Sequence, residues 1–212
     1  MIEIPELGDD FHAMWVELIE LAANPPAPWT LIGAHMVALH GWEAGSDQIR
    51  PSRDADVLVD VRAVTHGTML MSGKLIERGY HLDGHSPQGV GHRLVRDKIR
   101  IDVLAPDGLA EQANLQTVGG ARTVRVPGGT QALHRSRDVR VRTRSQQGSI
   151  PLPTLLGALL VKIRAIEIDD EPEAQKADVA FLLSLIEDPD PLAQDLRAKT
   201  KMDQAPCLLR RS

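Results

Sequence analysis

Cysteine is almost absent from this sequence: among 212 residues there is a single one, Cys207. One cysteine cannot form an internal disulfide or a cysteine-rich zinc site, which fits a reducing, cytoplasmic setting. Aromatic residues are also scarce, with three tryptophans, two phenylalanines and one tyrosine. An aromatic platform that stacks single-stranded bases is therefore not expected.

Long apolar runs are missing as well. No segment approaches the roughly 20 residues that a membrane-spanning helix needs, so no membrane contact is expected. The opening MIEIPELGDD has acids where a secretion signal has basic residues. The net charge of −5 does not by itself indicate a nucleic-acid partner. With 42% hydrophobic and 25% charged residues, the composition is that of a folded globular protein.

Hydrophobic periodicity predicts an α+β protein. Helices are expected at 9–23, 34–42, 66–79, 154–168 and 172–188, and strands at 30–32, 54–61, 92–96, 98–106 and in pieces of 117–144 around the turn PGGT. The resulting layout is a mixed, twisted sheet with flanking helices over 1–150, followed by a helical part over 151–212. The proline-containing PLP at 151–153 marks the expected boundary.

The segment RPSRDADVLVD contains two carboxylates on one strand face. Residues two apart on a strand point to the same side, so Asp54 and Asp56 share a face while the apolar residues between them anchor the other. A third acid, Asp102, interrupts the otherwise apolar strand at 98–106. Paired with the first strand, it would complete an oxygen-rich cluster suited to Mg²⁺. The alternative is an ordinary solvent-facing strand.

The order of these features resembles the nucleotidyltransferase signature of the DNA polymerase β-like superfamily. That signature is an apolar residue and a glycine (Gly33), a small residue (Ala34), a gap, an Asp-x-Asp pair, and a later third acid. More narrowly, the chain resembles AbiEii/MenT-type nucleotidyltransferases, the toxins of type IV toxin–antitoxin systems. The narrower likeness rests on LIGAHMVALHG, R-x-S-x-D-x-D, IDVLAP, a lysine-bearing helix after PLP, and a last helix reading K-x-D-x-x-x-L-L.

The resemblance implies a metal-dependent enzyme that uses an NTP as substrate. Asp54, Asp56 and Asp102 would hold Mg²⁺ or Mn²⁺, and together with Lys162 and Asp178 they would be the catalytic residues. Nucleotide binding would fall to residues of the strand–helix turn, the segment before the acids and the lysine helix: Gly33, Ala34, Arg50, Ser52 and Lys162.

Lys162 also stands out from the pattern of its own helix. It lies within an apolar stripe expected to comprise Leu155, Leu159, Ile163 and Ile166. An inward-facing ammonium needs an anion, or it must reach back to solvent along its own stem. Beside an expected triphosphate site, a nucleotide phosphate is the favoured anion.

A local excess of arginine occurs between residues 121 and 147, where Asp138 is the one acid. Arg140, Arg142 and Arg144 share one strand face. They could contact an RNA backbone, or they could simply keep an exposed sheet soluble. With the resemblance, a tRNA 3′ end is the expected acceptor and a cognate antitoxin the expected protein partner.

Two other functions remain open at the level of sequence. The same fold could transfer the nucleotide to a small molecule such as an aminoglycoside. It could also be a catalytically silent binding module.

Overall fold

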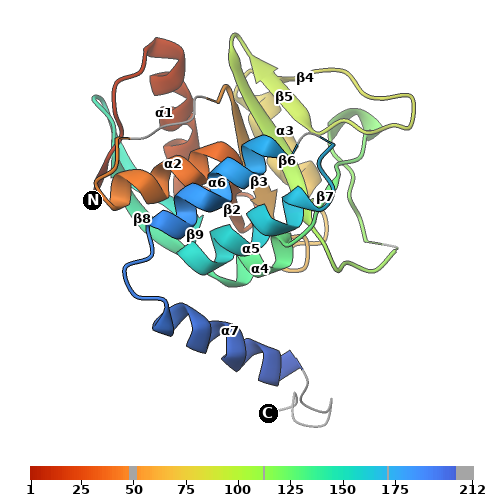
Figure 1. Cartoon of the computed structure of the whole chain (residues 1–212). Coiled ribbons are helices and arrows are strands. Elements are labelled where there is room, and N and C mark those ends of the chain that lie inside the picture. The colour runs from red at the N-terminus through yellow and green to blue at the C-terminus, as the bar shows by residue number, and fades with distance from the viewer. Residues whose placement is uncertain (48–51, 112, 171, 204–212) are drawn as a thin grey trace.

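A computed structural model describes residues 1–47, 52–111, 113–170 and 172–203 of the chain. At its centre is a six-stranded mixed sheet with the order β2-β3-β6-β5-β4, in which β7 also pairs with β6 (Figure 1). Its strands are β2 (Trp29–Ile32), β3 (Asp54–Val59), β4 (His81–Leu82), β5 (Arg93–Arg96), β6 (Ile99–Pro106) and β7 (Arg125–Val126). A second, three-stranded sheet has the order β1-β8-β9, from β1 (Ile2–Glu3), β8 (Ser136–Arg142) and β9 (Gln147–Pro153).

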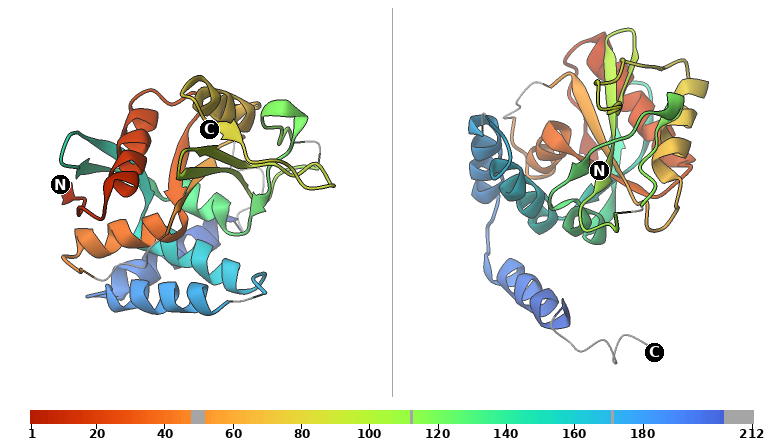
Figure 2. Two further views of the ribbon diagram at one scale, coloured as in Figure 1. Left: turned by 90° about the horizontal axis from the view of Figure 1, so that it is seen from above. Right: turned by 90° about the vertical axis from the view of Figure 1, so that its right-hand side faces the viewer.

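Helices cover both faces of the central sheet, as two perpendicular views show (Figure 2). They are α1 (Asp9–Ala23), α2 (Gly33–Glu43), α3 (Gly67–Glu77), α4 (Gly129–His134), α5 (Leu155–Ile166), α6 (Glu173–Ser184) and α7 (Asp190–Asp203), with a short 3₁₀ turn at Val118–Gly120. The α+β class and the mixed sheet predicted from the sequence are confirmed.

Close packing at two glycines fixes which helix covers which face. A Cβ on Gly67 of α3 would lie 2.9 Å from Val59, whereas one on Gly129 of α4 would lie 3.2 Å from Leu58. Adjacent strand residues point to opposite faces, so α3 lies on the purely apolar face of β3. The other face, which bears Asp54 and Asp56, is on the side of α4.

An aromatic cluster joins α1 to α2. Trp15 is completely buried and its ring lies edge-on to those of Trp42 and His35, at centroid distances of 5.6 and 5.4 Å. Phe11 packs against Trp15 at 6.0 Å. Half of the six aromatic side chains thus attach α1 to α2.

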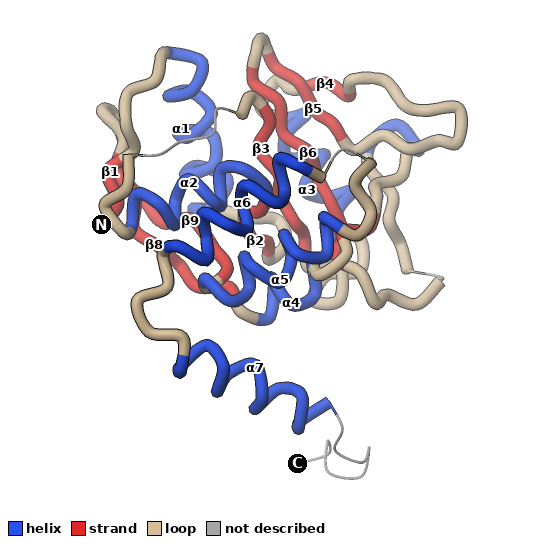
Figure 3. The backbone as a smooth tube through the Cα atoms, in the orientation of Figure 1, coloured by secondary structure: helices blue, strands red, loops and turns tan. Residues whose placement is uncertain are grey.

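The C-terminal helices share the core of the front part. Leu159, Val161 and Leu182 belong to the same buried cluster as the strands of the central sheet. The boundary expected at residue 150 falls inside β9, which pairs along its length with β8. In the view of Figure 3, α5 and α6 lie in front of the sheet, where they pack on each other and on α2 and α4, while α7 extends away from them.

Several elements differ from the sequence-based expectation. The buried face of α5 contains Leu156, Leu159, Val161 and Lys162, whereas Ile163, expected on that face, is exposed. The stripe is rotated because α5 packs on both α4 and α6 instead of on one partner. The strands β1 and β9 and the helix α4 were not expected; α4 begins at the PGGT turn that was predicted to join two strands.

Within the part of the chain that the structure describes, none of the helices combines the length and apolar character required to cross a bilayer.

The aromatic cluster makes a stability prediction. Trp15→Ala should lower the free energy of unfolding by about 3–5 kcal/mol, because it leaves a large cavity between α1 and α2. Chemical denaturation measures this loss. Leu183→Ala, at a side chain that is half exposed on α6, is the matched control and should change stability by less than about 1 kcal/mol. Equal losses in the two variants would contradict the packing described here.

Candidate active site

The parallel pairing of β3 with β6 brings the three predicted acids together. In this register Asp56 lies opposite Asp102, and Asp54 lies opposite Arg100. Partners in register on neighbouring strands point to the same face, about 5 Å apart. The carboxylates therefore lie on one face of the sheet at its β3–β6 centre, as the sequence predicted.

Gly33 closes this face from the side of β2. It follows Ile32, the partner of Asp56 in the β2–β3 ladder, and starts α2 with a φ of +71°. A Cβ at this position would lie 1.8 Å from Asp56 Oδ2. Both the left-handed backbone and the close approach to the carboxylate require glycine here.

Arg93, which the sequence analysis did not identify, lies between two of the acids. Its Nε donates to Asp102 Oδ1 at 2.9 Å, and its Nη2 donates to Asp102 Oδ2 at 2.9 Å and to Asp54 Oδ2 at 3.0 Å. Arg100 Nη1 lies farther from Asp54, at 3.5 Å from Oδ1. The sequence does contain a pattern from which the position of Arg93 could have been predicted. If Asp97-Lys98 is read as a two-residue hairpin turn, counting outward from it places Arg93 opposite Asp102.

The surroundings of Asp56 disfavour its charged form. Burial, followed by the negative charges of Asp102 and Asp54, raises the pKa of Asp56 from 3.8 to about 7, against the opposing charges of Lys162 and Arg93. The charged form of Asp56 is therefore disfavoured in this environment, and a cation bound beside it would favour that form.

Lys162 and Asp178 form a buried ion pair beside the acids. The Lys162 Nζ lies 2.8 Å from Asp178 Oδ2, with side-chain exposures of 6% and 3%. The same ammonium donates to Gln175 Oε1 at 3.0 Å. The inward direction predicted for Lys162 is correct, and the anion that it contacts is Asp178 from α6. Gln175 is a partner that sequence reasoning missed.

Ala34 and Ser52, which were also predicted to bind the nucleotide, have different surroundings in the structure. Ala34 follows Gly33 in the first turn of α2 and is buried. The Ser52 hydroxyl donates to the Asp54 carbonyl at 3.2 Å, so it stabilises the start of β3. Arg50 lies outside the described residues.

The carboxylate oxygens around Asp54 meet some of the requirements of a hard cation, but not all of them. Carboxylate oxygens are the ligands that Mg²⁺ and Mn²⁺ prefer. Asp54 Oδ1 is buried and accepts no hydrogen bond from the described residues. In the described part of the chain, however, no group of three acidic, histidine or cysteine side chains is already arranged around a common metal position.

Comparison with solved structures identifies this arrangement of sheet and helices. The antibiotic-resistance factor ANT(2'')-Ia superposes with a TM-score of 0.50 at 11% identity, over 90% of this chain and 93% of the other. The chain has the nucleotidyltransferase fold. A second structure, ANT(2'')-Ia in complex with adenylyl-2''-tobramycin, gives a TM-score of 0.49 at 12% identity over 92% and 98% of the two chains.

The lincosamide antibiotic adenylyltransferase LnuA, in its lincomycin-bound form, gives a lower TM-score of 0.44 at 16% identity, over 82% of this chain and 97% of the other. No protein-family profile matches the sequence, and no curated protein is significantly similar to it.

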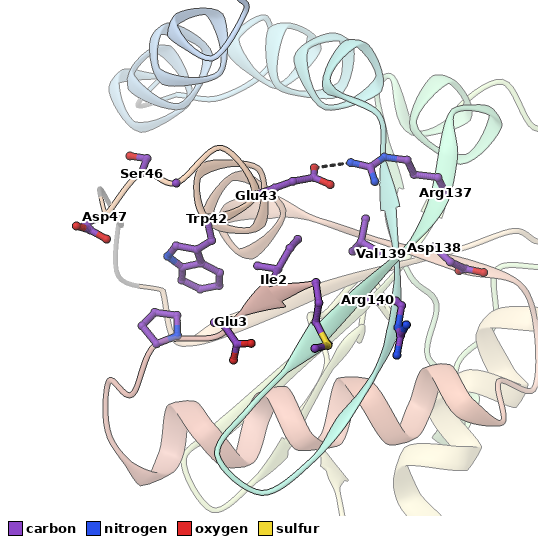
Figure 4. Close-up of a pocket in the computed structure, with 13 residues that line it drawn as sticks. Ile2, Glu3, Trp42, Glu43, Ser46, Asp47, Arg137, Asp138, Val139 and Arg140 are labelled. Atoms are coloured by element: carbon purple, nitrogen blue, oxygen red, sulfur yellow. Dashed lines mark hydrogen bonds and ion pairs between the residues drawn. The ribbon is translucent and has the colours of Figure 1, made fainter.

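Of the three arginines predicted to bind RNA, Arg140 and Arg142 lie on β8, in the other sheet, and Arg144 lies in the turn between β8 and β9. Arg142 pairs with Glu3 at 3.2 Å and Arg144 with Asp9 at 2.7 Å, so acids of the same chain already neutralise two of them. Arg140 lines a pocket of about 730 Å³ at the C-terminal end of α2, together with Glu3 and Trp42 (Figure 4). The length of α2, about 15 Å, separates this pocket from Gly33.

A different pocket lies near Asp54, although none of the three acids lines it. It has a volume of about 700 Å³ and lies among α1, the β5–β6 turn and the segment before β3. Ser52 and Arg100, which contact Asp54, form one wall, and Phe11, Met14 and Ile99 supply an apolar part. The volume is within the roughly 300–1,000 Å³ range of small-molecule sites.

The contact at Gly33 predicts that an added methyl group disrupts the site. Gly33→Ala should lower the free energy of unfolding by about 1–3 kcal/mol, because of the positive φ and the clash with Asp56. Thermal unfolding is the measurement. Gly73→Ala, in the interior of α3 with no atom within 4 Å of the added Cβ, should instead stabilise by about 0.5–1 kcal/mol. Stabilisation of the Gly33 variant would refute the close approach.

The raised pKa of Asp56 predicts a pH-dependent stability. Between about pH 4 and pH 7 the folded chain keeps a proton on Asp56 that the unfolded chain releases, so stability falls as the pH rises through this window. Asp56→Asn removes the ionisation. With a chelator present, this variant should match the wild type at pH 4 and exceed its stability at pH 8, by on the order of 2 kcal/mol after allowing for solvent screening.

Thermal unfolding of both proteins at the two pH values decides this point. A stability difference that is the same at pH 4 and pH 8 would contradict the assignment of the titration to Asp56.

Proposed function

We propose that this protein is a metal-dependent nucleotidyltransferase that transfers a nucleotidyl group from an NTP to a hydroxyl group of a small molecule. The observation that carries the proposal is the set of three carboxylates in register on β3 and β6, closed by the Gly33 turn and faced by Lys162. The nucleotidyltransferase fold supports it.

Asp54, Asp56 and Asp102 would hold Mg²⁺ or Mn²⁺. Two features support this assignment. Asp54 Oδ1 is buried and accepts no hydrogen bond from the described residues, and a bound cation would stabilise the charged form of Asp56, which burial and the neighbouring acids disfavour. When bound, the cation would neutralise charge on the triphosphate and orient it for in-line displacement.

The chain's own groups then have separate tasks. The backbone N–H groups of Gly33 and Ala34, at the start of α2, would bind phosphate oxygens. Asp102 would accept the proton of the attacking hydroxyl as its oxygen bonds to the α-phosphorus and the bond to pyrophosphate breaks. Lys162, held by Asp178, would place its positive charge where that leaving group develops its own.

The pocket beside Asp54 supports a small-molecule acceptor. Two of its lining residues, Ser52 and Arg100, contact Asp54. The pocket combines an apolar part with charged walls and has the size of a ligand site. ANT(2'')-Ia, which shares the fold, is itself an antibiotic-resistance factor.

The second candidate is an AbiEii/MenT-type toxin that modifies a tRNA 3′ end and is controlled by an antitoxin. The arginines of β8 and of the turn after it favour it, but the ion pairs of Arg142 and Arg144 reduce the positive charge available to an RNA backbone. We therefore rank it below the small-molecule function and let one experiment separate the two.

The experiment supplies each of the four α-labelled NTPs with Mg²⁺ or Mn²⁺, and either a panel of hydroxylated small molecules, including aminoglycosides and lincosamides, or total tRNA. Label on a small molecule is expected. Asp56→Asn should abolish it, by at least about a thousandfold, because a neutral amide is a poor metal ligand. Asp60→Asn, at the end of the same strand, keeps the oxygen that caps the following turn and should remain active.

Label on tRNA alone would replace the small-molecule function by the toxin function. Label on neither class with any NTP would overturn both, and would favour a binding module with this fold.

A further inference from the structure

The guanidinium of Arg93 occupies the space between Asp54 and Asp102. Both oxygens of Asp102 accept hydrogen bonds from it at 2.9 Å, and Asp54 Oδ2 accepts a third at 3.0 Å. These are charge-assisted bonds, and the paired contact to Asp102 is the geometry in which arginine binds carboxylates most strongly. One cation thus joins carboxylates from two strands.

Strand pairing fixes the backbones of all three residues, whereas the side chain of Arg93 is partly exposed to solvent. Arg93 pairs with Asp102 in the β5–β6 ladder, and β6 pairs with the strand of Asp54. The Asp102 side chain is only 8% exposed, whereas that of Arg93 is 36% exposed. The guanidinium can therefore turn away from the acids into solvent, while the two carboxylates remain in place.

The contacts also restrict what Asp102 can do. Because Arg93 donates hydrogen bonds to both oxygens of Asp102, the lone pairs that face Arg93 are not available to a metal ion. The carboxylate also cannot readily accept a proton from a substrate hydroxyl. Arg93 and a divalent cation would approach the same oxygens, and their like charges repel.

We propose that Arg93 is a positioning residue that substitutes for the metal cation: it bridges Asp54 and Asp102 in the protein without metal, and it is displaced when a divalent cation binds. This inference rests on the metal site of the proposed function, but its test needs neither nucleotide nor acceptor. A purely structural arginine would instead support metal binding by holding the ligands in register.

The test is the affinity of the full chain for Mn²⁺, measured by the electron paramagnetic resonance signal of free Mn²⁺ after chelator treatment. Arg93→Gln should bind Mn²⁺ about five- to tenfold more tightly than the wild type, because a competing positive charge is gone. Arg93→Lys keeps the charge and should stay within about twofold. Arg100→Gln, whose guanidinium lies 3.5 Å from one oxygen of Asp54, is the matched control and should gain less than Arg93→Gln.

Unchanged or weaker Mn²⁺ binding by Arg93→Gln would overturn the inference and leave Arg93 structural. If nucleotidyl transfer persists in the wild type, that outcome leaves the proposed function intact. Absence of Mn²⁺ binding in the wild type and all variants would overturn both.

A second measurement uses the wild type alone and does not depend on the folding of a variant. Arginine modification by phenylglyoxal, located by mass spectrometry, should be slow at Arg93 without metal and several-fold faster with Mn²⁺. Arg140, which is exposed on β8, should react at the same rate in both conditions. An unchanged or slower reaction at Arg93 with Mn²⁺ would exclude its displacement.

Discussion

The parallel pairing of β3 with β6 is the constraint on which the rest of the site depends. Its register alone decides that Asp56 and Asp102 face each other across the strands, with Asp54 on the same face. A slip of one residue would turn the acids toward α3 and bury them in the apolar core. The fully buried Ala55, Val57, Ile101 and Val103 on the opposite face prevent such a slip.

Bringing three acids together on a partly buried face costs free energy, and the surrounding elements offset this cost in different ways. Arg93 neutralises Asp54 and Asp102 directly. Lys162 acts on Asp56 through its charge but is itself compensated by Asp178. The pKa of Asp56 is nevertheless raised, first by burial and then by the charge of Asp102. The proposed cation would stabilise the charged form of this acid.

Local patterns were enough to predict the elements that form the site. The alternation in β3, the acid within β6 and the inward lysine of α5 each follow from periodicity within a few residues, and all three were correct. The orientation of α5 as a whole was not, because Ile163 is exposed by contacts with α4 and α6 that no pattern within the helix encodes.

Other features depend on partners that are distant in the chain. The arginines of β8 and of the turn after it have acids beside them that lie more than 130 residues away, because Arg142 pairs with Glu3 and Arg144 with Asp9. Their contact with RNA stays a prediction. Similarly, α4 begins at glycines because Asp107 accepts the N–H of Gly128 at 2.7 Å and that of Thr130 at 2.9 Å.

The strand β9 was missed for another reason. Its prolines, Pro151 and Pro153, were read as a boundary, but β9 is an edge strand of its sheet, where a residue without an N–H is tolerated.

Under the proposed function, metal binding would be coupled to folding. Because the carboxylates are held by strands that also form the core, their repulsion cannot relax by local movement without disturbing the packing around Val57 and Ile101. A cation that binds the folded arrangement and not the unfolded chain would stabilise the fold through mass action. The stability of the protein would then depend on divalent cations as well as on pH, and competition from Arg93 would reduce the contribution of the cation.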